Sequence, residues 1–380
     1  MRVLFVISGL AFGGAERQLI LLARQLVRSG HKASIYTLTR EAGRIDELAE
    51  SGVELVLDQK RRKLDLAVLQ RLRRHIRAWR PDIVHGFLFD GDFYSRLAAC
   101  GTGIPVLNSE RNDNYAYELS RLQLAGYRLT SALCEGIVAN SHAGAAFARR
   151  LHYLREPADV VWNGIDLGEV DARLARRAQP AHDIFPGADL KRLCMVGAIK
   201  PQKDHALALR VLGRLVERDP SWRLICAGEE LPKRFPGHKA RVMAERDRLR
   251  LEPFVKFVGN RRDVLEIVAS SDLLLVTSRF EGFPNAVLEA MACGTAVVST
   301  DYSDVRRILP VADSVVGSRG EDDLAAAVVR CYGKRSEIAR AQRRWVEQHA
   351  TAPASAAALL RVYAKYLAGK RRLATIERSA

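Results

Sequence analysis

The chain has 380 residues, and 48% of them are hydrophobic, which supplies enough apolar side chains for two domains of ordinary size. No apolar run reaches the roughly 18 residues that a membrane-spanning helix needs. The six cysteines are scattered without a C-x-x-C pair, which favours reduced thiols in the cytoplasm over a disulfide framework or a zinc site.

The chain is strongly basic, with a formal net charge of +16 from 60 basic and 44 acidic residues. Aromatic residues do not alternate with the basic ones and no nucleic-acid motif is present, so we expect no nucleic acid partner. An anionic membrane surface is the more natural partner, and a merely solvated basic face is the alternative. The basic residues gather at Lys60–Lys63, at Arg71–Arg80 and near the C-terminal end from Arg340 to Arg372.

Short apolar runs alternate with helical segments along the whole chain, which indicates parallel sheets buried on both faces. The opening MRVLFVISGLAF is interpreted as a buried strand and not as a signal peptide, because a glycine-rich turn and an amphipathic helix follow it. Strands are predicted at 2–8, 33–39, 82–87, 105–110, 136–141 and 160–164, and then at 192–199, 223–228, 255–259, 272–278 and 296–300.

Two such series predict an α/β protein of two doubly wound Rossmann-like domains. The break between them is expected in the polar stretch from Ala178 to Asp189, which contains prolines. We therefore predict a first domain at 1–175 and a second at 176–355. The final amphipathic segment, 356–380, has no strand to pair with, and we expect it to cross back to the first domain.

A glycine-rich turn follows the first strand and leads into a helix. Gly13 and Gly14 lie at the expected helix start, where free backbone N–H groups and the helix dipole attract anions. The spacing matches neither a dinucleotide fingerprint nor a P-loop, so a plain tight turn is the alternative.

The first strand of the second domain is followed by Lys200-Pro201-Gln202-Lys203-Asp204-His205. Lys203 is expected near the carboxyl end of that strand, at a helix start. A cation there would neutralise a diphosphate whose charge grows as a bond breaks. An exposed lysine is the alternative.

Two carboxylates, Glu281 and Glu289, lie in a loop and on the helix that follows it, with Pro284 near the helix start and Gly294 at its end. Across the intervening helical residues they are expected to lie ~10–12 Å apart. That separation is too wide for the paired acids of a glycoside hydrolase, which lie about 5–9.5 Å apart. It suits acids that hold two parts of an extended ligand, with Glu289 accepting from ribose hydroxyls. Two solvated acids are the alternative.

Taken together, these segments resemble the retaining glycosyltransferases of family 4, also called group 1, which have the two-domain GT-B fold with a cleft between the domains. The resemblance covers nearly the whole chain, in the order that the family has, and the stretch with the two glutamates is its most specific part. The matching segments are GGAE (13–16), VANS (138–141), VVWNGID (160–166), VGAIKPQKD (196–204), VKFVGN (255–260) and EGFPNAVLEAMACGTAVVSTD (281–301).

The resemblance implies a role for each matching residue. Glu281 would contact hydroxyls of the donor sugar, Glu289 the ribose, and Lys203 the diphosphate. Gly13 and Gly14 would lie across the cleft beside the phosphates and the acceptor. The loop and helix-start amides of Gly282, Phe283, Pro284 and Asn285 would face sugar and phosphate, and Asn163 and Gly164 would form the interdomain turn.

The chain departs from the family at two places. The arginine that usually follows the glycine at 197 is replaced by Ala198, and Lys200 is the candidate replacement. A histidine is usual after the fourth strand, where this chain has Asn108-Ser109-Glu110-Arg111-Asn112. Glu110 or Arg111 is a candidate for that position, and His85 is another, with a core histidine as its alternative.

The tripeptide Asp90-Gly91-Asp92 has the D-x-D form that binds metal in a different glycosyltransferase fold. It lies in the first domain and not in the nucleotide half. We interpret it as polar surface on the acceptor side, and we expect neither a metal nor another cofactor.

The reaction that the resemblance implies is transfer of a sugar from a UDP- or GDP-linked donor to a glycan or polyprenyl-linked acceptor, with retention at the anomeric carbon. The leaving phosphate would take the acceptor's proton, since the sequence offers no convincing nucleophile. Surface polysaccharide assembly at the cytoplasmic membrane face is the expected setting. Two alternatives remain: a nucleotide-sugar epimerase of the same fold, and an inactive basic binding protein, which Ala198 favours and the retained Glu281, Glu289 and Lys203 oppose.

Overall fold

The computed structural model describes residues 1–11, 13–41, 43–62, 64–111, 120–151, 157–176 and 180–379. Phe12, Lys63, Asn112 and Ala178, which belong to stretches noted in the sequence, lie outside these residues. The chain divides into two compact units: unit 1 is Met1–Gly164 with Ala352–Ala380, and unit 2 is Ile165–Thr351. The sequence led us to expect divisions after residues 175 and 355.

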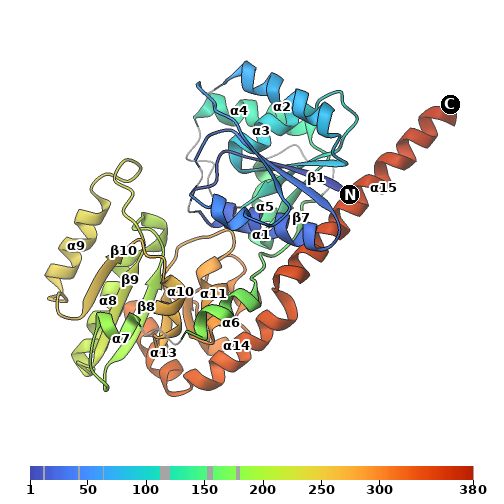
Figure 1. The fold of residues 1–380 in the computed structure, drawn as a ribbon. Coiled ribbons are helices and arrows are strands. Elements are labelled where there is room, and N and C mark those ends of the chain that lie inside the picture. The colour runs from blue at the N-terminus through green and yellow to red at the C-terminus, as the bar shows by residue number, and fades with distance from the viewer. Residues whose placement is uncertain are drawn as a thin grey trace. The chain divides into compact units, whose positions relative to one another are not determined.

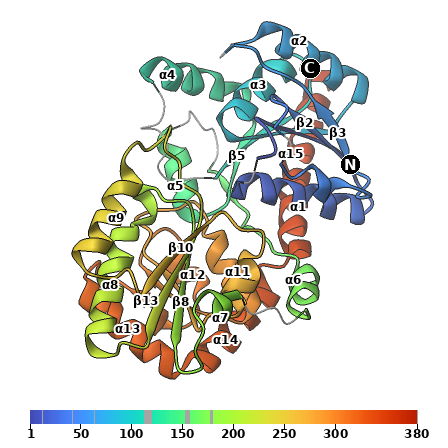
Figure 2. The same cartoon turned by 60° about the vertical axis from the view of Figure 1, so that its left-hand side comes forward.

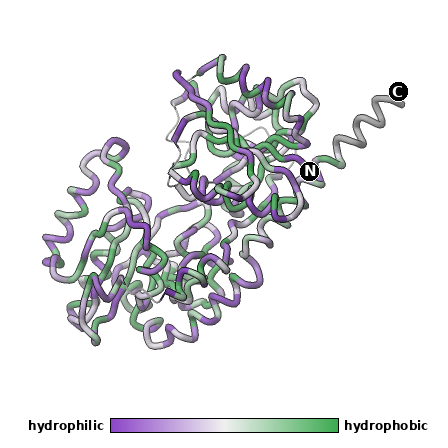
Figure 3. Tube along the Cα trace, in the orientation of Figure 1, coloured by the Kyte–Doolittle hydropathy of each residue, from purple (hydrophilic) through white to green (hydrophobic). Residues whose placement is uncertain are grey.

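Unit 1 contains a seven-stranded parallel sheet in the order β3-β2-β1-β4-β5-β6-β7 (Figure 1). Its strands β1, β4, β5 and β6 are buried along most of their length. Along the trace, hydrophobic stretches alternate with hydrophilic ones, as Figure 3 shows by colour. The strands are β1 (Arg2–Ile7), β2 (Lys32–Thr37), β3 (Glu54–Leu57), β4 (Ile83–Phe87), β5 (Val106–Glu110), β6 (Gly136–Ala139) and β7 (Asp159–Val160).

Helices cover both faces of this sheet. Val3, Phe5 and Ile7 of β1 share one core cluster with α1 (Gly14–Arg28) and α15 (Ala352–Ser379). Leu4 and Val6 point to the other face, where the core is completed by α2 (Leu66–Trp79) and α3 (Leu88–Ala99). The remaining helices are η1 (Ile45–Leu48), α4 (Arg121–Thr130), η3 (Ser131–Leu133) and α5 (His142–Leu151).

Unit 2 contains a six-stranded parallel sheet in the order β10-β9-β8-β11-β12-β13 (Figure 2). The strands are β8 (Lys191–Val196), β9 (Trp222–Ala227), β10 (Val255–Gly259), β11 (Leu273–Val276), β12 (Ala296–Thr300) and β13 (Val315–Val316). The helices are α6 (Leu167–Leu174), α7 (Pro180–Ile184), η4 (Pro201–Lys203), α8 (His205–Arg218), α9 (His238–Arg248), α10 (Val264–Ala269), α11 (Asn285–Cys293), α12 (Val305–Ile308), η5 (Ala312–Ser314), α13 (Glu321–Gly333) and α14 (Arg335–His349).

These two parallel sheets with interleaved helices confirm the predicted fold class. All six cysteines are free thiols, and three of them, Cys194, Cys226 and Cys331, are buried. Across the described ranges, we find no helix with both the length and the apolar character needed to pass through a bilayer.

Candidate active site

The turn after β8 places Lys203 next to a glycine. Gly197 has a φ of 145°, and a Cβ on it would lie 2.6 Å from Cε of Lys203. Glycine is therefore needed here both for the backbone conformation and for the space that the lysine side chain takes. The chain then forms η4, which ends at Lys203, and α8 starts after Asp204.

Lys203 and Glu281 form an ion pair in unit 2, with Nζ 2.5 Å from Oε1. Their side chains are only 14% and 12% exposed, so water screens the pair weakly. The hydroxyl of Ser278 donates to the same Oε1 at 2.6 Å. The sequence indicated Lys203 and Glu281 as separate site residues, and the structure brings them into contact across 78 positions of the chain.

The loop after Glu281 is buried and leads directly into α11. Gly282, Phe283 and Pro284 are all buried, and the hydroxyl of Ser303 donates to the carbonyl of Gly282 at 3.0 Å. Pro284 is the N-cap of α11, which begins at Asn285, and the helix ends at Gly294 in the left-handed conformation, with φ 73°. Glu289 lies on this helix and is partly buried.

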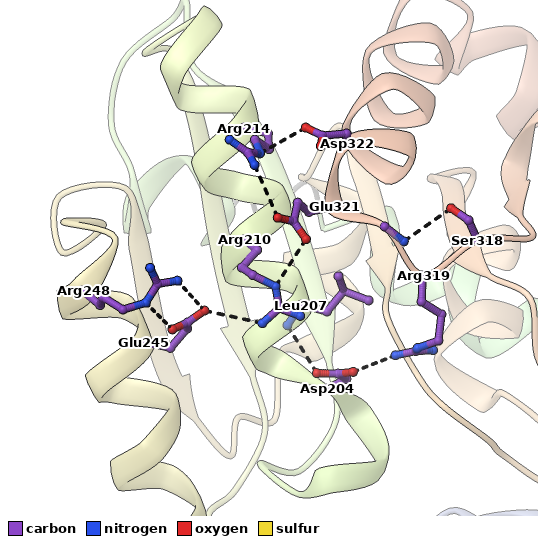
Figure 4. A network of polar contacts seen from close by, with 11 residues as sticks. Asp204, Leu207, Arg210, Arg214, Glu245, Arg248, Ser318, Arg319, Glu321 and Asp322 are labelled. Carbon is purple, nitrogen blue, oxygen red and sulfur yellow. Dashed lines mark hydrogen bonds and ion pairs between the residues drawn. The ribbon is translucent and has the colours of Figure 1, made fainter.

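Asp204 holds this turn in place through a network that the sequence did not indicate (Figure 4). It is a non-glycine residue with positive φ (52°), a conformation that needs support from its surroundings. Its carboxylate caps α8 at Leu207 N–H (3.3 Å) and accepts hydrogen bonds from Arg319 (2.7 Å) and Arg279 (3.0 Å).

The same network connects Asp204 to Thr277 and Ser278, which follow β11 and precede Glu281. Arg319 donates to the carbonyls of Thr277 (3.0 Å) and Ser278 (2.9 Å). The Thr277 hydroxyl in turn donates to the carbonyls of Lys203 (2.9 Å) and Asp204 (3.0 Å). Lys203 is therefore held from its backbone side by the strand that leads to Glu281. Lys200 lies at the start of η4 and is partly buried.

In unit 1, the glycine turn lies at the start of α1 as predicted, with Gly13 as its N-cap. A Cβ on Gly13 would fall 2.0 Å from Oε2 of Glu16, so glycine leaves the space that this carboxylate occupies. Burial raises the pKa of Glu16. The carboxylate of Glu16 therefore lies close to the N-terminus of α1.

His85 is completely buried at the centre of β4. Its Nδ1 lies 2.7 Å from the hydroxyl of Tyr363 on α15, and its Nε2 lies 2.9 Å from the hydroxyl of Ser109. Burial lowers the pKa of His85 well below its usual value, so the ring is neutral at pH 7. This is the arrangement of a core histidine, one of the two roles that the sequence left open.

Glu110 and Arg111 lie at the end of β5. Glu110 is buried, with 1% of its surface exposed, and its carbonyl accepts from Asn140 N–H at 3.1 Å. Arg111 donates to Oδ1 of Asn163 (2.9 Å) and to the hydroxyl of Ser109 (3.3 Å). Both residues thus belong to the carboxyl edge of the unit 1 sheet, where open α/β sheets bind ligands.

The tripeptide Asp90-Gly91-Asp92 was interpreted as polar surface, and this interpretation was wrong for Asp92. Asp92 is 1% exposed and accepts hydrogen bonds from Asn108 Nδ2 (2.9 Å) and the Tyr127 hydroxyl (2.5 Å). Burial raises the pKa of Asp92 to about 6. Asp90 is partly exposed and pairs with Lys60. The carboxylate points inward because α3 turns Asp92 toward the sheet.

The predicted site residues thus fall in two sets. Lys203, Glu281, Glu289 and the loop from Gly282 to Asn285 belong to unit 2. Gly13, Gly14, His85 and Glu110 belong to unit 1. Most of them lie where strands of their own parallel sheet end, although His85 lies within β4 and Glu289 on α11. In unit 2 the structure brings Lys203 and Glu281 into contact.

Comparison with known families agrees with this geometry. Residues 12–169 match the model described as Glycosyltransferase Family 4, and residues 190–334 match the model described as Glycosyl transferases group 1. The chain therefore belongs to the group 1, family 4 glycosyltransferases, as the resemblance predicted.

Individual proteins support this assignment. EpsF of Bacillus subtilis, named as a glycosyltransferase, is 26% identical over 316 residues, which cover 79% of each chain. A Campylobacter jejuni enzyme, N-acetylgalactosamine-N,N'-diacetylbacillosaminyl-diphospho-undecaprenol 4-alpha-N-acetylgalactosaminyltransferase, is 29% identical over 151 residues, or 40% of this chain and 37% of its own.

A solved structure confirms the fold. HepE of Anabaena, in complex with UDP and glucose, superposes with a TM-score of 0.82 at 18% identity, over 96% of this chain and 100% of its own. At this identity the similarity shows a shared fold, which is the GT-B arrangement of two Rossmann-like domains.

Proposed function

We propose that this glycosyltransferase transfers a hexosyl or N-acetylhexosaminyl group from a UDP- or GDP-linked donor to a hydroxyl of a glycan or lipid-linked glycan, with retention at the anomeric carbon. The observation that carries the proposal is the contact of Lys203 with Glu281 at the strand ends of unit 2. In this proposal the cation Lys203 binds the diphosphate of the donor, and the adjacent Glu281 binds its sugar.

The ion pair suggests how the donor is received. A diphosphate that reaches Lys203 replaces Glu281 as its anionic partner, and Glu281 is then released to accept hydrogen bonds from sugar hydroxyls. As the glycosidic bond breaks, negative charge grows on the phosphate, and Lys203 with the amides at the start of α11 stabilises it. The leaving phosphate takes the acceptor's proton on the same face. Glu289 binds the ribose, and no metal is needed.

The relatives guide the choice of substrates. The HepE structure contains UDP and glucose, and the name of the Campylobacter enzyme specifies a diphospho-undecaprenol acceptor. We therefore place this chain in surface polysaccharide assembly, in the cytoplasm and in peripheral contact with the anionic inner face of the membrane. Sedimentation with anionic vesicles tests this contact, since binding through basic residues weakens as salt rises.

One experiment separates the transferase from its alternatives. Purified protein is incubated with UDP- and GDP-sugars, with and without an extract of lipid-linked glycans, and nucleoside diphosphate release is measured. A transferase releases it only with acceptor, an epimerase yields altered or free sugar from donor alone, and an inactive binding protein does neither. A thermal-shift screen selects the base, because a ligand at one hundred times its Kd adds about 2.7 kcal/mol of stability.

A further inference from the structure

Unit 1 exposes three leucines in one short stretch of the chain. Leu57, Leu64 and Leu66 are 38%, 54% and 62% exposed. Leu57 ends β3, Leu64 lies in the loop that follows, and Leu66 is the first residue of α2. Single exposed leucines are common on protein surfaces, whereas several in one place indicate a surface that binds something.

The basic residues of the same stretch fall into two groups. One group is held by unit 1 itself: Lys60 pairs with Asp90, and Arg71 binds Asp58, with Nη2 2.7 Å from Oδ1. The contact of Arg71 with Asp58 also holds the first turns of α2 next to the end of β3. The other group is exposed to water and consists of Arg61, Arg62, Arg74, Arg77 and Arg80.

Helix α2 shows how leucine and arginine come to share one face. Val68 and Leu72 are buried in the core on one side of the unit 1 sheet, which α2 covers (Figure 1). Leu66, Arg74 and Arg77 lie on the opposite side of the helix, because positions 66, 74 and 77 fall on one stripe at 3.6 residues per turn. The outer face of α2 is therefore apolar at its start and cationic further along.

The carboxylates of this stretch do not neutralise its outer face. Asp58 and Asp65 are the only acids in the sequence from 57 to 80. Asp58 accepts from Arg71, and Asp65 caps α2 by accepting from Ala67 N–H at 3.0 Å. Arginines alone would suit any polyanion, but exposed leucines are stabilised only where they leave water, which favours a lipid surface.

We propose that the exposed leucines and arginines between Leu57 and Arg77, here called the β3–α2 surface, dock this protein on an anionic lipid bilayer. The arginines bind lipid phosphates while the leucines enter the headgroup region. The loop follows the carboxyl end of β3, and Glu110 lies at the carboxyl end of β5 in the same parallel sheet. Docking therefore brings the ligand-binding edge of unit 1 toward an acceptor in the membrane. The proposal rests on the proposed function, in which the acceptor is lipid-linked.

Co-sedimentation of the whole chain with lipid vesicles tests the proposal. The vesicles contain either phosphatidylcholine alone or phosphatidylcholine and phosphatidylglycerol in equal parts. We expect the wild type to bind the anionic vesicles, and more weakly as salt rises. Replacing both Arg61→Gln and Arg62→Gln should weaken binding at least about tenfold. Replacing both Leu64→Ser and Leu66→Ser should weaken it at least about fivefold.

Two control variants change similar residues elsewhere. Arg149→Gln with Arg150→Gln removes a neighbouring pair of exposed arginines on α5 of the same unit. Val329→Ser removes an apolar side chain on α13 that is 49% exposed. Both controls should bind the anionic vesicles like the wild type. Equal losses in the controls and in the β3–α2 variants would overturn the proposal, because binding would then follow total charge and hydrophobicity.

The remaining outcomes separate the docking surface from the proposed function. UDP affinity and Tm should stay at wild-type values in every variant, since the replaced side chains are exposed. A loss of vesicle binding that accompanies a fall in Tm, or leucine variants that bind like the wild type, would overturn the proposal. Acceptor-dependent release of nucleoside diphosphate by a protein that binds no vesicles would reject the surface and leave the transferase. Vesicle binding that depends on the β3–α2 surface in a protein without UDP affinity would support the surface and reject the proposed function.

Discussion

The two units surround their buried charges differently. In unit 2 opposite charges meet directly, as in Lys203 with Glu281 and in the bidentate contact of Arg173 with Glu266. In unit 1 the described hydrogen bonds of Arg111 and Asp92 go to neutral groups, although opposite charges also act on them: Arg96 on Asp92, and Asp92 and Glu110 on Arg111. These buried charges are therefore held differently: by direct ion pairs in unit 2, and by hydrogen bonds to neutral groups in unit 1.

Replacement of Lys203 tests the paired side of this comparison and has the largest expected effect. In the proposed mechanism Lys203 faces the departing phosphate, so Lys203→Ala should lower turnover at least tenfold and up to about 10³-fold. The measurement is nucleoside diphosphate release in the presence of acceptor. Lys191→Ala is the control, because Lys191 also pairs with an aspartate, Asp219, in the same unit. Unchanged turnover in a folded Lys203→Ala protein would remove Lys203 from the site.

Asp92 tests the unit 1 side of this comparison through pH. Burial raises its pKa from 3.8 to about 6, so the folded state holds the proton more tightly than the unfolded state. The stability that this adds is complete below about pH 4 and is lost as pH rises to about 6, by up to about 3 kcal/mol.

Urea titrations from pH 4 to pH 7 measure this loss. Asp92→Asn should show a smaller decline in the free energy of unfolding over that range than the wild type. Asp90→Asn, on the same helix but partly exposed and paired with Lys60, should keep the wild-type decline. If both variants decline like the wild type, Asp92 does not titrate in this range.

Arg319 sharpens the comparison, since it acts on Lys203 through Asp204. Arg319→Ala removes one of the two arginines on the Asp204 carboxylate, and the resulting shift of the turn should weaken UDP binding about tenfold. Arg319→Lys should recover part of the affinity. Arg214→Ala should bind UDP like the wild type, because Arg214 pairs with Glu321 and Asp322 and not with Asp204 (Figure 4).

A double-mutant cycle decides whether Arg319 acts through Lys203. If it does, Arg319→Ala should have little effect on UDP affinity in a Lys203→Ala background. If Arg319→Ala lowers UDP affinity equally in the wild-type and Lys203→Ala backgrounds, Arg319 does not act through Lys203.

Sequence patterns predicted the buried strands best. Strands β10 and β12 have the predicted bounds. Strand β3 was missed, since its residues are exposed or half-buried at the sheet edge and Glu54 begins it. Strand β13 has only two residues, too few for any periodicity.

The site was predicted only where its residues belong to sequence motifs. Lys203 and Glu281 lie in motifs and were identified, but their contact depends on folding. Asp204 and Arg319 are 115 positions apart, and Arg319 belongs to no motif, so only the three-dimensional structure reveals their bond. Arg111 was a candidate from its position after the strand, whereas its contacts with Asn163 and Phe87 depend on how the chain folds.

Helix α15 has a consequence for the order in which this chain folds. Ala356, Leu359 and Tyr363 are almost fully buried in the same core as β1 and α1, although they are made after the whole of unit 2. During synthesis the first 164 residues leave the ribosome with part of this apolar surface uncovered, while unit 2 can already fold behind them. Unit 1 is therefore begun before unit 2 but can be completed only after it, when α15 has been made.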